Sequence, residues 1–273
     1  MVIPAYAGAL HPQSKRETAL ITGASAGIGL DLARLMAAAN FDLILVARST
    51  DKLQALAREL EAQHGIHAHV IPADLARRES PEEIFAEIAR RGLHTDILVN
   101  NAGFGVYGPF SQTSLPDELQ MIQVNITSLT HLTKLAFPGM IARKRGRILN
   151  VASTAAFQPG PLMAVYYASK ACVLSFSEAI ANELNGTGVT VTCLCPGPTE
   201  TEFAARARLE KTRLFKLGAM TSMDVARAGL QGMLRGRTLV IPGVKNKLLA
   251  QSVRFSPRKL VTAIARKIQE SRD

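Results

Sequence analysis

Cysteine, aromatic residues and long apolar runs are all scarce in this 273-residue sequence. The three cysteines (Cys172, Cys193 and Cys195) are too few for a disulfide framework, and no histidine cluster joins them at zinc spacing. We therefore expect a reducing, cytoplasmic setting and no metal. No stretch reaches the roughly 18 uncharged apolar residues that a membrane-spanning helix needs, so we expect no such helix.

The N-terminal end lacks the pattern of a secretory signal. Pro4 and Pro12 interrupt its apolar part, and Lys15 and Arg16 follow that part instead of preceding it. We interpret residues 1–17 as a mobile N-terminal extension.

Acidic residues are scarce at the C-terminal end. The segment Arg235–Asp273 holds ten Lys or Arg and two Asp or Glu, and so carries +8 of the net charge of +10. Because the rest of the chain is nearly neutral and shows no groove of interleaved basic and aromatic residues, we expect no nucleic-acid partner. Residues 244–273 mix apolar residues with cations, and Pro257 divides them into two predicted helices. A basic amphipathic tail of this kind packs on another subunit or lies on an anionic membrane surface.

Apolar, β-rich runs alternate along the chain with helical patterns. Strands are predicted at Thr18–Thr22, Asp42–Val46, His67–Ile71, Asp96–Val99, Arg147–Val151, Val189–Leu194 and Thr238–Val240. Helices are predicted at Gly27–Ala39, Thr50–Gln63, Pro81–Arg91, Leu115–Phe137, Val165–Leu184 and Ser222–Leu234. Such alternation favours a parallel sheet covered on both faces. We predict a doubly wound, seven-stranded α/β sheet of Rossmann type, with one domain over residues 18–243 and a helical tail over 244–273.

A glycine-rich turn joins the first predicted strand to the first predicted helix. It reads Thr22-Gly23-Ala24-Ser25-Ala26-Gly27-Ile28-Gly29, a G-x-x-x-G-x-G spacing. Glycines let the backbone approach a pyrophosphate, and the following helix directs its free N–H groups at the anion. The position of the turn after a strand and before a helix supports dinucleotide binding. The predicted contacts are Gly23, Ser25, Ala26, Gly27, Ile28 and Gly29.

The end of the second strand lacks the acidic residue that binds the adenosine ribose in NAD-selective sheets. Arg48 stands there, and no acid follows until Asp51. A guanidinium suits a 2′-phosphate, so we predict NADP rather than NAD. The alternative is a solvated arginine at a strand end.

Polar residues also follow the third and fourth strands, at the edge where open α/β sheets bind ligands. Asp74, followed by Leu75, can accept a hydrogen bond from the adenine amino group. Asn100, Asn101 and the small pair Ala102-Gly103 can let the adenosine lie close to the backbone. Each of these residues can equally be a turn or helix cap.

Tyr166 and Lys170 lie four residues apart on a predicted helix and therefore share one face. A phenol is a poor base at neutral pH, but a neighbouring ammonium and an oxidised nicotinamide lower its pKa. Such a tyrosine can protonate an alkoxide or deprotonate an alcohol. Tyr167 has Ala171 at the corresponding position and lacks this partner.

Two further polar residues complete the candidate catalytic group. Ser153 follows the fifth strand and can hold a carbonyl oxygen beside the phenol, although a helix-cap role explains a serine equally well. Asn125 lies inside a predicted helix, where asparagine is mildly unfavourable, which suggests a packing or water-binding role.

Together these residues resemble the short-chain dehydrogenase/reductase family. The resemblance runs from about Thr18 to Val240. It is carried by Thr22-Gly23-x-x-x-Gly27-x-Gly29, Asp74, Asn100-Asn101-Ala102-Gly103, Asn125, Ser153, Tyr166-x-x-x-Lys170 and Pro196-Gly197. It implies hydride transfer to or from a nicotinamide, and a homodimer or homotetramer.

The resemblance also implies residue roles. Tyr166 is then the acid/base, Ser153 positions the carbonyl, and Lys170 also binds the nicotinamide ribose. The backbone of Asn125 holds a water that connects Lys170 to solvent. Pro196 and Gly197 line the nicotinamide, with Thr199 and Thr201 near its carboxamide or the pyrophosphate.

The sequence leaves more than one substrate class and more than one function possible. The loops Asn101–Gly105, Phe157–Pro161 and Pro196–Thr201 look like those of ketone and 3-oxoacyl reductases, which predicts a hydrophobic ketone, aldehyde or 3-oxoacyl substrate. The segment Glu202–Leu217 mixes apolar and basic residues and is predicted to be an amphipathic flap over the site. The competing hypotheses are a non-catalytic NADP-sensing regulator of the same fold and a membrane-surface binder driven by the tail.

Overall fold

The computed structural model describes residues 16–201 and 218–270. The extension up to residue 15 and the predicted flap Glu202–Leu217 lie outside the described residues.

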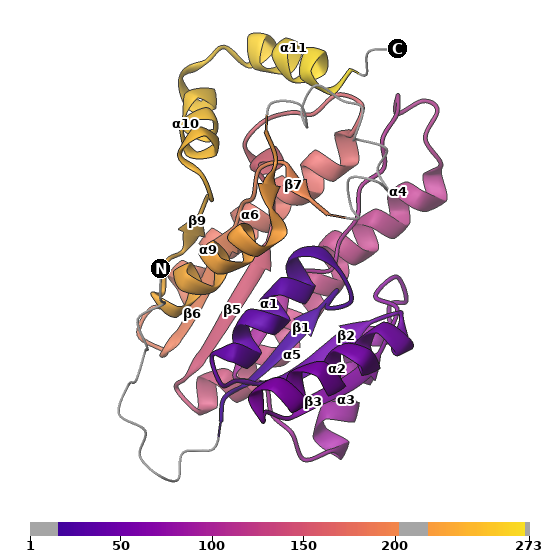
Figure 1. Cartoon of the computed structure of the whole chain (residues 1–273). Coiled ribbons are helices and arrows are strands. Elements are labelled where there is room, and N and C mark those ends of the chain that lie inside the picture. The colour runs from indigo at the N-terminus through magenta and orange to yellow at the C-terminus, as the bar shows by residue number, and fades with distance from the viewer. Residues whose placement is uncertain (1–15, 202–217, 271–273) are drawn as a thin grey trace.

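One parallel sheet forms the centre of the molecule (Figure 1). Its strands are β1 (Thr18–Thr22), β2 (Asp42–Ala47), β3 (Ala68–Pro72), β4 (Ile97–Asn100), β5 (Gly146–Val151), β6 (Val189–Leu194) and β9 (Leu239–Val240). The strand order is β3-β2-β1-β4-β5-β6-β9, and every neighbouring pair is parallel. The predicted doubly wound sheet is confirmed, and each strand boundary agrees with its prediction to within one residue.

Successive residues of each strand face opposite helical layers because side chains alternate along a strand. Ile21 faces a core shared with α1 (Gly27–Ala38), α2 (Thr50–His64) and α9 (Ser222–Leu234). Leu20 faces a second core shared with α3 (Ser80–Arg90), α5 (Leu129–Ala142) and α6 (Ala164–Glu183). Burial on both faces explains why these strands are almost continuously apolar.

The helix predicted at Leu115–Phe137 is longer and less regular than expected. α4 (Leu115–Ile122) continues through a π-helical segment, η1 (Gln123–Ser128), directly into α5. α5 passes Pro138 and ends at Ala142, so the predicted end at Phe137 is wrong. Proline removes one backbone bond, but Met140, in the following turn, is fully buried in the second core, and that burial holds the helix together.

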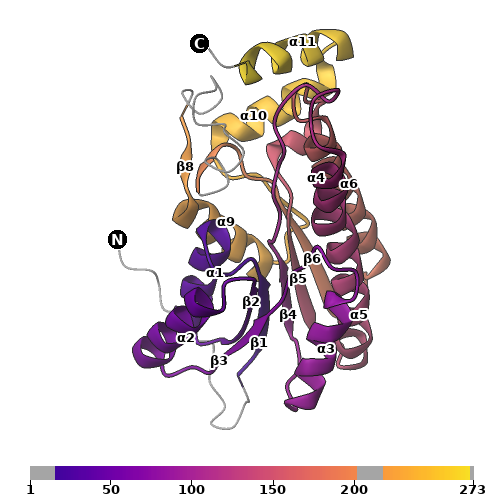
Figure 2. The same ribbon diagram turned by 90° about the vertical axis from the view of Figure 1, so that its right-hand side faces the viewer.

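The C-terminal tail forms two helices, as predicted. α10 (Val244–Ser252) is followed by a 3₁₀ turn, η3 (Val253–Phe255), and α11 (Arg258–Gln269) begins directly after Pro257. Both helices lie at the end of the molecule near the start of α6 (Figure 2). A small parallel pair of strands, β7 (Thr199–Glu200) and β8 (Met220–Thr221), was not predicted.

Over residues 16–201 and 218–270, we find no helix with the length and apolar character that crossing a membrane demands.

Candidate active site

The glycine turn after β1 has the geometry that a pyrophosphate needs. Gly23 and Gly27 adopt φ angles of +67° and +54°, which favour glycine. A side chain at Gly29 would overlap the carbonyl of Gly23. No side chain caps α1 and no acidic residue lies in its first turn, so its N–H groups stay available. Ser25, Ala26 and Ile28 are partly exposed along this turn.

Two side chains hold this turn in place, one at the end of β1 and one directly after β4. The Asn101 amide donates to the carbonyls of Thr22 (2.9 Å) and Gly23 (3.3 Å). The Thr22 hydroxyl accepts from the N–H groups of Asn101 (3.0 Å) and Ala102 (3.1 Å) and donates to the Val99 carbonyl (3.2 Å). Asn101 therefore fixes the conformation of the glycine turn through these hydrogen bonds. Thr22, to which the sequence analysis gave no role, stabilises the same turn.

Arg48 is exposed at the end of β2, and no described residue engages its guanidinium. It is therefore accessible to a phosphate at this edge. Asp74 is half-buried, and its carboxylate accepts from the Ala76 N–H at 3.1 Å, while Leu75 is buried. Asn100 does not reach this edge: it is 3% exposed, and its amide donates to Thr133 and Asn150. These buried partners hold the Asn100 side chain beneath the edge, so only its backbone is left to lie along an adenosine.

Ser153 and Tyr166 come together from separate elements. Ser153 follows β5, and Tyr166 lies in the first turn of α6. The two side chains are hydrogen-bonded, and Ser153 Oγ also accepts from the Ala155 N–H at 3.1 Å. Ser153 therefore caps the short helix η2 (Thr154–Phe157), which is the helix-cap role considered for it, and it also binds the Tyr166 phenol.

Lys170 lies one helical turn beyond Tyr166, as predicted. Its Nζ is 5.8 Å from the centroid of the Tyr166 ring and donates to the Val151 carbonyl at 2.9 Å. The side chain is 5% exposed, and this burial lowers the pKa of Lys170 to about 8. The amine therefore titrates near physiological pH.

Burial governs the pKa of Tyr166 in the protein alone. Burial raises it above its ordinary value, and the hydrogen bond from Ser153 only partly opposes that shift. Desolvation of the buried phenol is the largest contribution to this shift. Tyr166 is thus protonated at neutral pH, which is the form that carbonyl reduction requires.

Asn125 lies in the π-helical segment and connects three elements. Its Oδ1 accepts from the Phe104 N–H (3.1 Å), and its Nδ2 donates to the Phe104 carbonyl (3.0 Å) and to Ser169 Oγ (3.1 Å). A methyl group on Gly103 would lie 3.0 Å from Asn125 Oδ1 and 3.4 Å from Lys170 Nζ. Asn125 and Lys170 therefore converge on Gly103, next to Ala102.

The segment after β6 approaches both the catalytic group and the glycine turn. The Pro196 carbonyl accepts from the Thr154 N–H (2.8 Å) and Ser153 Oγ (3.4 Å). The Thr201 methyl lies against Gly27, 3.1 Å from where a Cβ would stand, and Thr199 donates to the Gly197 carbonyl at 2.9 Å. One edge of the sheet thus holds most of the predicted contacts.

Cys193 and Cys195 are fully buried in an apolar cluster next to this edge, as expected of small apolar groups. The Cys193 thiol and burial raise the pKa of Cys195, so it stays a neutral thiol. Among the described residues, no three His, Cys, Asp or Glu are grouped as metal ligands.

Comparison with known proteins agrees with this geometry. Residues 17–212 match the model of the family described as short chain dehydrogenase. The chain is 38% identical over 180 residues to a very-long-chain 3-oxoacyl-CoA reductase of Phaeosphaeria nodorum. The matched region is 64% of this chain and 53% of that protein. The chain thus spans about half the length of this curated relative.

Two solved structures are also similar. The short-chain dehydrogenase from Sphingobium yanoikuyae in complex with NADPH has a TM-score of 0.78 and 31% identity, covering 89% of this chain and 97% of its own. The bulky-bulky ketone specific alcohol dehydrogenase from Comamonas testosteroni has a TM-score of 0.75 and 28% identity, covering 90% and 96%. Sequence, fold and site geometry together assign this chain to the short-chain dehydrogenase family.

Proposed function

We propose that the chain is an NADP(H)-dependent oxidoreductase that interconverts a ketone or aldehyde and an alcohol. The observation that carries this proposal is the buried Tyr166 phenol, hydrogen-bonded to Ser153 and one turn from Lys170, at the same sheet edge as the glycine turn. The alternative is an NADP-sensing regulator without turnover, and the complete catalytic group argues against it.

The residues at this edge fit a dinucleotide. The uncapped start of α1 and the glycines without room for side chains accept a pyrophosphate, and exposed Arg48 accepts a 2′-phosphate. We assign Asp74 and Leu75 to the adenine side, and Asn101, Ala102 and Gly103 to the adenosine. Pro196, Gly197, Thr199 and Thr201 are assigned to the nicotinamide end. When bound, the nicotinamide supplies or accepts the hydride at the reacting carbon.

The chain's own residues manage the oxygen and its proton. Ser153 holds the carbonyl oxygen, and Tyr166 donates the proton as negative charge develops on it. Lys170, whose pKa is about 8, binds the ribose and favours the phenolate that results. The Tyr166 phenolate regains its proton from Lys170, and a water held by the Asn125 backbone returns a proton from solvent to Lys170.

We propose a hydrophobic ketone or 3-oxoacyl compound as the substrate. An apolar cluster flanks Tyr166. It consists of Met121, Ala155, Met163 and Tyr167, with Phe104, Val106, Tyr107 and Val165 packed against it. The Phaeosphaeria nodorum relative is named as a 3-oxoacyl-CoA reductase and the Comamonas testosteroni structure as specific for bulky ketones, which supports this substrate class.

We also propose that the tail contacts an anionic membrane surface from a cytoplasmic location. Apolar side chains stand exposed on α10, η3 and α11, among them Leu248 (66%), Phe255 (89%) and Leu260 (53%), and Lys and Arg residues interleave with them. Flotation with phosphatidylserine vesicles tests this: Phe255→Ser is expected to weaken binding, and unchanged binding contradicts it. Homodimer or homotetramer formation is a further proposal, which light scattering after size exclusion measures.

The experiment that tests the function is NADPH oxidation by the full chain. The panel comprises ketones, aldehydes, quinones, sugars and 3-oxoacyl thioesters. We expect turnover to be fastest with apolar ketones or 3-oxoacyl thioesters. NADPH binding without turnover of any compound favours the regulator, and failure to bind NADPH contradicts both functions.

A further inference from the structure

The C-terminal helix α11 is fastened to the apolar cluster beside Tyr166. Gln269, near the end of this helix, is 1% exposed. Its Nε2 donates to Tyr167 Oη, and its backbone carbonyl accepts from Tyr107 Oη at 2.8 Å. Both tyrosines belong to the cluster that flanks the catalytic phenol. Gln269 thus connects the tail to two tyrosines of that cluster, Tyr107 and Tyr167.

Little else of α11 is buried. Of its twelve residues, only Ala265 and Gln269 are buried, while Leu260 and Ile264 are 53% and 50% exposed. Apolar burial therefore contributes little to holding this helix in place. The hydrogen bonds of Gln269 consequently have a large share in deciding whether α11 stays docked.

Tyr167 also contacts the catalytic residue Tyr166. Its ring meets the Tyr166 ring edge-on, with centroids 6.0 Å apart. Gly160 leaves no room for a side chain against the other part of the Tyr167 ring. The ring is thus enclosed between the loop before α6 and Tyr166, and the Gln269 amide engages its hydroxyl. Figure 2 shows α11 across this end of the molecule.

We propose that Gln269 is a positioning residue that docks α11 as the outer wall of the substrate site, and that this wall selects substrates with long apolar chains. The inference rests on the proposed reductase function. On this proposal a long apolar chain reaches from the Tyr166 hydroxyl past the apolar cluster to α11, whereas a short ketone does not. Only the long substrate is then affected by the docking of the helix.

The test compares two methyl ketones that share a reacting group, 2-butanone and 2-undecanone. Gln269→Leu keeps the side-chain size and removes the hydrogen bond to Tyr167. Because Gln269 Oε1 accepts no hydrogen bond within the described part of the chain, this change also removes an unsatisfied acceptor, so folding is expected to persist. Gln251→Leu, the same substitution on the exposed face of α10, is the matched control.

We expect Gln269→Leu to raise KM for 2-undecanone about tenfold, the scale of one net hydrogen bond. KM for 2-butanone and kcat for both ketones should change less than about twofold, because Tyr166 and Ser153 are untouched. Tyr167→Phe should act in the same direction and Gln251→Leu should have no effect. Hydrogen exchange over residues 258–269 should accelerate in the Gln269 and Tyr167 variants.

Binding gives a readout that is independent of turnover. The chain has no tryptophan and four tyrosines, three of which lie at this site, so tyrosine fluorescence of the NADP⁺-loaded protein reports ketone binding. An equal KM change for both ketones, or none, overturns the inference and reduces Gln269 to a structural role. If neither ketone turns over but Gln269→Leu still weakens 2-undecanone binding tenfold, the reductase function fails while the inference holds.

Discussion

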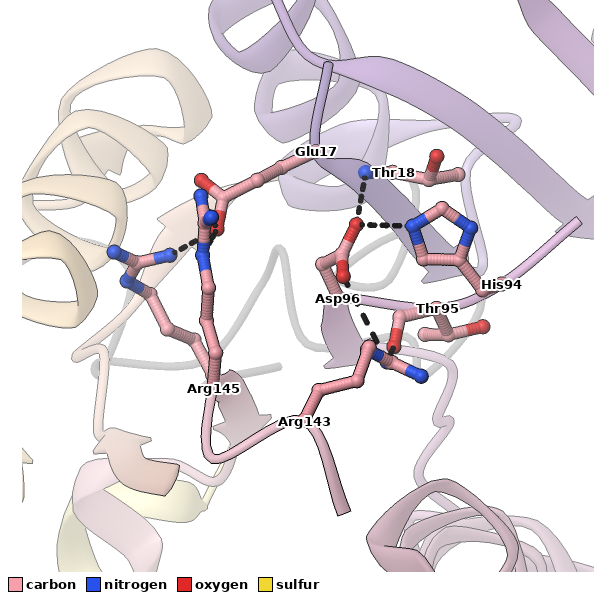
Figure 3. A network of polar contacts seen from close by, with 8 residues as sticks. Glu17, Thr18, His94, Thr95, Asp96, Arg143 and Arg145 are labelled. Atoms are coloured by element: carbon pink, nitrogen blue, oxygen red, sulfur yellow. Dashed lines mark hydrogen bonds and ion pairs between the residues drawn. The ribbon is translucent and has the colours of Figure 1, made fainter. Parts of the chain in front are cut away.

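The two ends of the parallel sheet differ in whether their charged side chains form ion pairs. At the amino end, Asp96 is 6% exposed and accepts from the Thr18 N–H at 2.9 Å, with His94 Nε2 at 3.0 Å and Arg143 at 3.7 Å (Figure 3). Beside it, Glu17 pairs with two arginines of the α5–β5 connection and β5, Arg145 at 2.7 Å and Arg147 at 2.8 Å.

At the carboxyl end, two ionisable side chains of the candidate site, Lys170 and Arg48, have no counter-charge against them among the described residues. Lys170 is buried and donates a hydrogen bond to the Val151 carbonyl, and Arg48 is exposed with no partner among the described residues. Burial displaces the pKa values of Tyr166 and Lys170 in opposite directions. The amino end thus contributes stability, whereas the carboxyl end holds groups for which we propose a cofactor and a substrate as partners.

The largest expected effect is on catalysis. Tyr166→Phe should lower kcat/KM for carbonyl reduction about a thousandfold, because it removes the proton donor. NADPH binding and the unfolding free energy should change little. Tyr167→Phe, the same change at the neighbouring residue, should keep kcat. Turnover that survives in Tyr166→Phe means that another group is the acid.

At the amino end of the sheet, removing a paired carboxylate should lower stability and leave kcat unchanged. Asp96→Ala leaves the Thr18 N–H without its acceptor and Arg143 without its carboxylate. We expect it to lower the unfolding free energy by about 2–3 kcal/mol, the scale of hydrogen bonds to a buried charge. Glu87→Ala removes an exposed pair with Arg90 and Arg91 and should cost much less. Urea denaturation measures both, and equal losses contradict the contrast.

Lys170 gives the carboxyl end a pH dependence of stability. Its folded pKa of about 8 lies below the unfolded value near 10.4, so the unfolded chain binds more protons between these values. Stability from this group therefore rises with pH, by about 1–2 kcal/mol between pH 8 and 9.5. Lys170→Met should abolish this rise, and exposed Lys134→Met should keep it. If the unfolding free energy rises equally with pH in the wild type and in both variants, Lys170 is not the titrating group.

The smallest effect is expected at Arg48. Arg48→Asp should reduce the preference for NADPH over NADH, measured as the ratio of kcat/KM values, by about tenfold or more, since it replaces a phosphate-binding cation with a hydroxyl-binding carboxylate. Arg58→Asp, at an exposed position on α2, is the control for charge alone. The same ratio in both variants would remove Arg48 from the cofactor site.

Features that depend on short stretches of sequence could be predicted. The strand ends followed from apolar runs, and the shared face of Tyr166 and Lys170 followed from their spacing on one helix. Burial was harder to predict. Nothing local indicated that Asn100 turns inward to Thr133 and Asn150, or that burial raises the pKa of Tyr166.

Long-range contacts left no signal in the sequence. Gln269 and Tyr167 are 102 residues apart, and no motif connects them. Tyr167 had been set aside because it lacks a lysine one turn later, yet it carries the contact that fastens the tail. The π-helical segment around Asn125 and the passage of α5 through Pro138 were likewise unpredicted, because packing against the sheet overrides local preference.

The sequence by itself determined the alternation of strands and helices, the position of the glycine turn and the spacing of Tyr166 and Lys170, since backbone preference and side-chain periodicity act over a few residues. Only the tertiary structure decided that Ser153 meets Tyr166, that Asn101 clamps the turn and that α11 docks beside the site. Those contacts depend on how distant elements exclude water together, and the same burial raises the pKa of Tyr166 and lowers that of Lys170.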